Sequence, residues 1–104
     1  HYQPWWEPGH SGQAWALLGA IGQATERIEL GTGVTAPVHR YHPAVVAQFA
    51  ATLDELFPGR AFLGAGSGES LNESPAGMDW PDTGEQVRRV LVLDHALAPL
   101  SAWK

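Results

Sequence analysis

The sequence predicts an α/β fold built around two parallel strands. Two observations carry this prediction. Helix-like and strand-like patterns alternate along the chain in the order helix, strand, helix, strand, helix, and the two strands begin about one βαβ unit apart, at Ile28 and Ala61. In a βαβ unit the strands are parallel and the crossover is right-handed. Repeated units of this kind build either an open doubly wound sheet or an eight-stranded barrel.

The first helix is expected over residues 11–27, where apolar residues recur at helical spacing and Ser11 could cap the first turn. Residues 28–35, IELGTGVT, are rich in β-branched residues and predict a buried strand. Gly31 and Gly33 indicate that the far end of this strand leaves regular geometry.

The second helix is expected to begin at His42 as the cap, with Pro43 at the first helical position, where its missing N–H does least harm. Pro58–Gly59 should end it. Its predicted apolar stripe consists of Val45, Val46, Phe49, Leu53, Leu56 and Phe57.

Residues 60–65, RAFLGA, predict the second buried strand, with a glycine-rich run at its carboxyl end. A loop rich in Pro, Gly and Asp follows over residues 74–84. A last helix is then expected from the spacing of apolar residues between Val87 and Leu97, and Pro99 should end or kink it.

Length and composition bound the class of protein. One hundred and four residues predict a single domain, 1–104, and 44% hydrophobic residues are enough for a packed core. The net charge of −5 argues against binding to nucleic acid or to an acidic membrane surface. The absence of cysteine excludes disulfides and thiolate zinc sites, and no stretch is long and apolar enough to span a membrane. We therefore expect a cytoplasmic location.

Two parallel strands alone leave both edges of the sheet unpaired. The pattern thus indicates either a part of something larger or a chain that associates with another chain. Self-association through the exposed strand edges, or a homodimer, is the expected form of that association.

The run LGAGSGESLNE, residues 63–73, raises the question of nucleotide binding. Counting from Gly64, a dinucleotide fingerprint would need glycine at the sixth position, which is Glu69 here, and a carboxylate would repel phosphate. No P-loop lysine follows. Capping a helix is the commoner use of an acid beside a glycine turn, so the residues alone leave the function undecided.

A metal site is not predicted. His39 and His42 are close enough in sequence to reach one ion, but His42 is better used as the helix cap and no third ligand is near. The aromatic start HYQPWW, residues 1–6, is by composition more typical of a core or interface segment than of a site.

Three stretches together resemble the coenzyme F420-dependent branch of the luciferase-like barrel family, and most of all its glucose-6-phosphate dehydrogenase-like members. They are HYQPW (residues 1–5), the segment 26–60 with GTGV and RYHPAVVAQ, and FLGAGSGESLNE (62–73). The resemblance implies a segment of a TIM (β/α)8 barrel, about three βα units with parallel strands, whose site lies at the carboxyl ends of the strands.

The resemblance also implies residue roles. His1 corresponds to the base that takes a substrate hydroxyl proton, Trp5 to the aromatic residue that stabilises the charged histidine, and Glu69 to the acid that exchanges a proton with the deazaflavin. Gly33–Val34 corresponds to a strand-end bulge with a non-proline cis peptide behind the ring. The implied coenzyme-binding residues are Gly33, Val34, Thr35, Ser67, Gly68 and Asn72.

The implied activity is hydride transfer between an alcohol or sugar-type small-molecule substrate and coenzyme F420. Departures from the family pattern bear on it, since Ala36 stands where some sugar-phosphate-oxidising members have a threonine that contacts the coenzyme. Two alternatives stay open. One is a luciferase-like monooxygenase that uses FMN, and the other is an inactive barrel fragment that serves as an assembly or interaction module.

Overall fold

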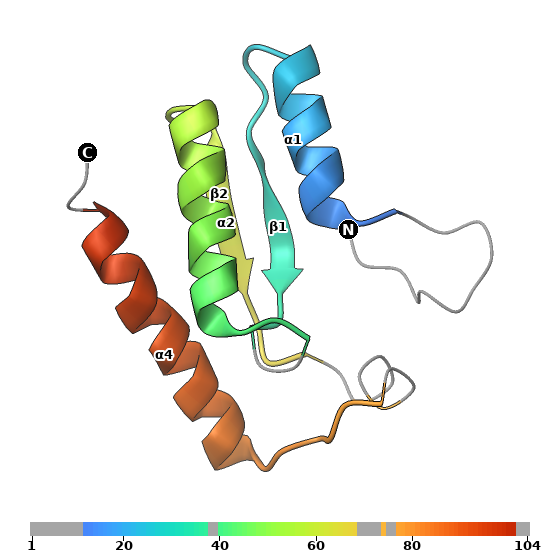
Figure 1. Cartoon of the computed structure of the whole chain (residues 1–104), viewed down its shortest axis with the longest axis vertical. Helices are drawn as coiled ribbons and strands as arrows, with labels where there is room; N and C mark the ends of the chain where they lie inside the picture. Colours follow the sequence, from blue (N-terminus) through green and yellow to red (C-terminus); the bar gives the residue numbers. More distant parts are fainter. Residues whose placement is uncertain (1–11, 38–39, 69–73, 75–76, 102–104) are drawn as a thin grey trace.

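The computed structural model describes residues 12–37, 40–68, 74 and 77–101. Along the chain lie α1 (Ala14–Ala24), β1 (Leu30–Thr35), α2 (Pro43–Leu56), β2 (Ala61–Ala65) and α4 (Thr83–Ser101) (Figure 1). The predicted order of helix, strand, helix, strand, helix is confirmed. The whole is a flat slab of 38 × 36 × 15 Å, the thickness expected of one sheet with one layer of helices.

The two strands pair in parallel, with Leu30 opposite Ala61. The strand prediction began β1 too early, at Ile28. Pairing starts where the Leu30 N–H donates to the Arg60 carbonyl (2.7 Å), whereas the Ile28 side chain is 50% exposed. Ile28 therefore belongs to the connection between α1 and β1 and not to the sheet, although it is β-branched.

The start of α2 follows the sequence prediction. His42 is the N-cap, its Nδ1 accepts a hydrogen bond from the Ala44 N–H (3.2 Å), and Pro43 occupies the first turn. The start of α1 does not follow the prediction, because the cap is Gln13, whose Oε1 accepts from the Ala16 N–H (2.8 Å). Ser11, the predicted cap, lies outside the described residues.

The core lies between the sheet and the helices and consists of two clusters. Leu30, Leu53 and Phe57 form the first, and Val46, Ala47 and Leu93 form the second. The predicted stripe of α2 is narrower than expected, since Val45 and Leu56 are 44% and 60% exposed. Beside the clusters, Trp15 of α1 stacks on Phe49 of α2 with ring centroids 4.5 Å apart. These contacts hold α1, α2 and α4 as a single layer.

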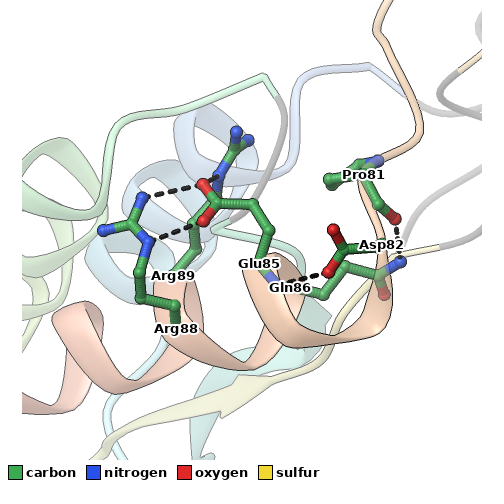
Figure 2. A network of polar contacts seen from close by, with 6 residues as sticks. All are labelled: Pro81, Asp82, Glu85, Gln86, Arg88 and Arg89. Atoms are coloured by element: carbon green, nitrogen blue, oxygen red, sulfur yellow. Dashed lines mark hydrogen bonds and ion pairs between the residues drawn. The ribbon is translucent and has the colours of Figure 1, made fainter.

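The last helix does not end at Pro99, one of the two predicted effects of that residue, because α4 runs to Ser101. Its start is well specified (Figure 2). Asp82 Oδ1 accepts from the Glu85 N–H (3.0 Å), and Gln86 Nε2 donates to the Pro81 carbonyl (2.8 Å). Within the described residues, no helix is long and apolar enough to cross a membrane.

The Glu85 carboxylate near the start of α4 accepts hydrogen bonds from two guanidinium groups. Arg88 donates from two nitrogens (2.6 and 2.7 Å) and Arg89 from one (2.7 Å) (Figure 2). Hydrogen bonds from Arg88 first, and then from Arg89, lower the pKa of Glu85 from 4.5 to about 2. A carboxylate in the first turn also interacts favourably with the helix dipole.

At the amino end of the sheet, one residue joins three segments of the chain. The Arg60 guanidinium donates to the carbonyls of Ile28 (2.8 Å), Thr25 (2.9 Å) and Gly22 (3.3 Å), and to Thr25 Oγ1 (2.7 Å). Carbonyls at the end of a helix have no partner within the helix. Arg60 therefore caps the C-terminus of α1 and fixes it to the start of β2.

Candidate functional site at the carboxyl ends of the strands

The carboxyl ends of β1 and β2 lie side by side, at the same edge of the sheet (Figure 1). Thr35, the last residue of β1, pairs with Ala65, and its carbonyl accepts from the Gly66 N–H (2.9 Å). The predicted coenzyme-binding residues that the structure describes are Gly33, Val34, Thr35, Ser67 and Gly68. All of them belong to these two strand ends or directly follow them.

An irregularity in β1 shapes this edge. Thr32 pairs with Leu63 and Thr35 with Ala65, so β1 takes three residues where β2 takes two. The bulge contains a cis peptide between Gly33 and Val34, as the resemblance implies. In a regular strand positions 32 and 35 would face opposite sides, but here both are buried and the two residues between them are exposed.

Val34 and the neighbouring glycines form a small platform at the surface. Val34 is 57% exposed, yet a Cβ added at Gly66 would lie 2.7 Å from Val34 Cγ2, and one added at Gly64 would lie 3.2 Å from Cγ1. A Cβ at Gly33 would meet only open space. The platform is therefore Val34 and Gly33 lying against the glycine backbone of β2, an uncharged surface that suits one face of a flat ring.

Beneath this platform, two buried threonine hydroxyls connect the strands. Thr35 Oγ1 donates to Thr32 Oγ1 (2.8 Å), and Thr32 Oγ1 donates to the Gly64 carbonyl (3.3 Å). The two side chains are only 7% and 6% exposed. The buried side of the bulge is thus hydrogen-bonded to β2, while its other side, which carries Val34, is exposed.

The chain leaves β2 through Gly66, Ser67 and Gly68. Gly68 has a φ of +83°, a left-handed conformation that glycine adopts with little cost. These residues follow β2 at the edge of the sheet where Val34 is exposed. The segment that follows in the sequence begins with Glu69 and includes Asn72.

Comparison with known proteins decides the family. Residues 1–97 match the protein family described as luciferase-like monooxygenase.

The chain belongs to the luciferase-like monooxygenase family.

The similar proteins are named for their dependence on one coenzyme, F420. The chain is 48% identical over 91 residues to an F420-dependent glucose-6-phosphate dehydrogenase of Microbacterium testaceum, and 54% identical over 90 residues to one of Beutenbergia cavernae. Each match covers 86% of this chain and 27% of the relative. The chain therefore spans about a quarter of the length of these curated relatives.

A solved structure shows the same arrangement of elements. It is an F420-dependent secondary alcohol dehydrogenase in complex with an F420–acetone adduct, with a TM-score of 0.80 and 38% identity, and the match covers 94% of this chain and 30% of the other. The predicted fold, a segment of a TIM barrel of the luciferase-like type with parallel strands, is confirmed. In a luciferase-like barrel, β1 and β2 are neighbouring strands whose carboxyl ends open on the site face.

The three residues predicted to carry the chemistry, His1, Trp5 and Glu69, lie outside the described residues, as does the predicted coenzyme-binding residue Asn72. Their roles stay predictions, and so does the treatment of 1–104 as one partial domain. Within the described ranges, no group of three His, Asp or Glu side chains is placed to hold a metal ion. His42 Nδ1 serves as the cap of α2.

An open groove lies between α2 and α4 in the part of the chain that the structure describes. Its lining is mostly alanine, from α2 and from Ala96 of α4, and none of it comes from the strands. Its polar lining is Gln48, Thr52 and Glu55, none of which is among the residues that the family resemblance assigns to the site. The strand ends are therefore the better candidate site.

Sequence reasoning missed the part that Thr32 plays beneath the bulge. Its hydroxyl is the middle of the connection between Thr35 and the Gly64 carbonyl. The available signal was the spacing of two threonines across Gly33–Val34, in combination with the implied bulge. A regular strand would separate these side chains, so only the bulge makes them partners.

Proposed function

We propose that the protein containing this segment is an F420-dependent oxidoreductase, which transfers a hydride between an alcohol or sugar-type substrate and the deazaflavin coenzyme. The observation that carries the proposal is the uncharged Gly33–Val34 platform at the carboxyl ends of two parallel barrel strands. Its support is the similarity to F420-dependent dehydrogenases over most of this chain.

The fit of the coenzyme to these residues is a matter of shape and charge. Gly33 leaves open space, Val34 offers an apolar surface, and Gly64 and Gly66 allow Val34 to lie close to the β2 backbone. A flat ring needs such a backing on one face, with polar groups only at its rim. Ser67 and Gly68 directly follow the platform and are the proposed rim on the β2 side.

When bound, F420 would accept or supply the hydride at its deazaflavin ring. The work left to the chain is proton transfer. In the proposal His1 takes the substrate hydroxyl proton, since an imidazole near neutral pKa suits a general base, and Trp5 stabilises the charged histidine. Glu69 holds the proton exchanged at the ring. A small-molecule partner and a cytoplasmic location belong to the same proposal.

The proposal is tested on the polypeptide encoded by the complete reading frame that contains this segment. F420 is added, followed by secondary alcohols and sugar phosphates in turn. We expect coenzyme binding and, with one substrate class, loss of the visible absorbance of oxidised F420. Glu69→Gln should keep coenzyme binding within a fewfold and slow the absorbance change at least 100-fold, which is the scale of general acid–base catalysis.

Two other outcomes would reject this assignment. Preference for FMN with substrate-dependent oxygen consumption would assign the protein to the monooxygenases of the family. Binding of neither coenzyme would instead favour an assembly module, and sedimentation would then reveal self-association through the strand edges.

A further inference from the structure

The exposed bulge of β1 has a buried support that the proposed catalysis does not use. Thr35 Oγ1 donates to Thr32 Oγ1, and Thr32 Oγ1 donates to the carbonyl of Gly64 on the neighbouring strand. We propose that Thr32 and Thr35 are positioning residues that hold the Gly33–Val34 bulge in the form that receives the coenzyme ring. This inference rests on the proposed function and adds to it the residues that fix the platform.

Burial separates this role from direct coenzyme contact. Thr32 is 6% and Thr35 7% exposed, whereas Val34 is 57% exposed. Each hydroxyl has a single proton, and both protons are already donated within the chain. The Thr35 hydroxyl therefore has no second proton to give to a coenzyme, and its effect on binding passes through the position of Val34.

Interactions with the neighbouring chain segment hold the bulge on both sides. Before it, Thr32 pairs with Leu63, and after it the Thr35 carbonyl accepts from the Gly66 N–H (2.9 Å). The hydrogen bond between the Thr35 and Thr32 hydroxyls joins the two ends of the bulge across the unpaired residues Gly33 and Val34. Without it, the extra residue of β1 has fewer interactions that fix its place, and a shift by one residue turns side chains to the opposite face.

Close packing links the position of the bulge to that of Val34. A Cβ at Gly66 would lie 2.7 Å from Val34 Cγ2, so Val34 rests against the backbone that directly follows β2. A small movement of the bulge therefore changes the level of the Val34 methyl groups. A ring stacked on those methyl groups would then lose part of its dispersion contact.

The test uses shape-matched variants of the complete protein. Thr35→Val keeps the branched shape and removes the hydroxyl, whereas Thr35→Ser keeps the hydroxyl and removes a methyl group. Thr52→Val is the matched control, because Thr52 Oγ1 donates to the Gln48 carbonyl (2.8 Å) on an exposed part of α2. Thr35→Ala removes the same hydroxyl without placing a methyl group against Thr32, and it replaces Thr35→Val if that variant does not fold.

Three readouts are measured for each variant: the Kd of F420 by fluorescence titration, the amide hydrogen exchange of Val34 and Gly66 without coenzyme, and the steady-state KM and kcat. We expect Thr35→Val to raise the Kd about tenfold, the scale of one lost buried hydrogen bond, and to speed exchange at both amides. Thr35→Ser and Thr52→Val should stay within about twofold of the unsubstituted protein. The KM for coenzyme should rise with the Kd while kcat stays within about twofold.

The inference is overturned if Thr35→Val binds F420 as tightly as Thr52→Val does, or if Thr35→Ser loses as much affinity as Thr35→Val. Failure of the proposed function has a different signature, in which the unsubstituted protein does not bind F420 at all. In that case the coenzyme role is rejected, and faster exchange at Val34 and Gly66 in Thr35→Val alone would still establish the hydroxyl connection as the support of the bulge.

Discussion

The two ends of the same pair of strands are built in opposite ways. At the amino end, Arg60 donates four hydrogen bonds to the chain around the end of α1, and the buried Leu30 and Phe57 lie close by in the core. At the carboxyl end, glycines replace side chains and Val34 is largely exposed. This difference matches the two faces of a TIM barrel, in which residues at the amino ends of the strands stabilise the fold and the carboxyl ends are available for binding.

The sharpest way to test this division is to weaken the amino end alone. Arg60→Met removes all four hydrogen bonds, and Arg60→Lys also removes most of them, because an ammonium group lacks the planar fork of the guanidinium. We expect either substitution to lower the free energy of unfolding by about 2–3 kcal/mol. Chemical denaturation of the complete protein measures this loss.

Arg27→Met is the control for Arg60, because it removes the same charge from an exposed position in the same connection. It should change the free energy of unfolding by about 0.5 kcal/mol or less. The F420 affinity of Arg60→Met, measured where the protein is folded, should stay within about twofold. A large loss of affinity would break the division between the two ends.

The complementary change is made at the carboxyl end. Gly66→Ala places a Cβ 2.7 Å from Val34 Cγ2, and Val34 is a side chain that can move, so the platform and not the fold absorbs the change. We expect F420 binding to weaken about tenfold, which corresponds to about 1.4 kcal/mol. Gly19→Ala is the control, since Gly19 lies in α1, away from the strand ends, and its Cβ would meet no atom within 4 Å. It should leave the F420 affinity within about twofold of that of the unsubstituted protein.

The sequence was sufficient for the elements whose signals are local. His42–Pro43 specifies the start of α2 because both residues act on the adjacent turn. It was insufficient for α1, because glutamine is an uncommon cap and Gln13 acts only when its long side chain folds back to Ala16. Pro99 was predicted to end or kink α4, and the helix continues past it to Ser101.

The site was predictable in part for the same reason. Gly33–Val34 and Gly68 lie in two short motifs that carry the family resemblance, and the structure brings those two strand ends together. Arg60 and Thr32 could not be singled out, because their partners are distant in sequence or depend on the bulge. Arg60 reaches residues 22–28, and Thr32 reaches Gly64 on the other strand.

A smaller effect is expected at the turn that leads into the amino end of β2. Gly59 has a φ of +73°, and a Cβ there would meet no atom within 4 Å, so only the backbone conformation disfavours another residue. Gly59→Ala should lower the free energy of unfolding by about 1 kcal/mol. Gly19→Ala is the control, because Gly19 lies within α1 with open space around it and alanine favours the helix. That variant should be as stable as the unsubstituted protein or more so.

The smallest effect concerns pH and lies outside both strand ends. The folded-state pKa of Glu85 is lowered to about 2 from 4.5, so the stabilisation by its ion pairs is complete above pH 4.5 and is lost as the pH falls toward 2. The stability difference between the unsubstituted protein and Glu85→Gln should shrink across that window. It should be small at every pH because the pairs are partly exposed.

Thermal unfolding of both proteins from pH 6 to pH 2 measures this difference. Glu55→Gln, which removes a charge from the exposed surface of α2, corrects for the change in net charge. A difference that grows as the pH falls would contradict the sign derived for Glu85.

The most direct test of the division between the two ends is a map of amide hydrogen exchange in the complete protein, with and without F420. Coenzyme should protect the amides of Val34, Thr35, Ser67 and Gly68, and leave those of residues 25–30 and of Arg60 unchanged. Protection confined to the amino end, or equal at both ends, would contradict the assignment of the carboxyl ends of β1 and β2 as the coenzyme site.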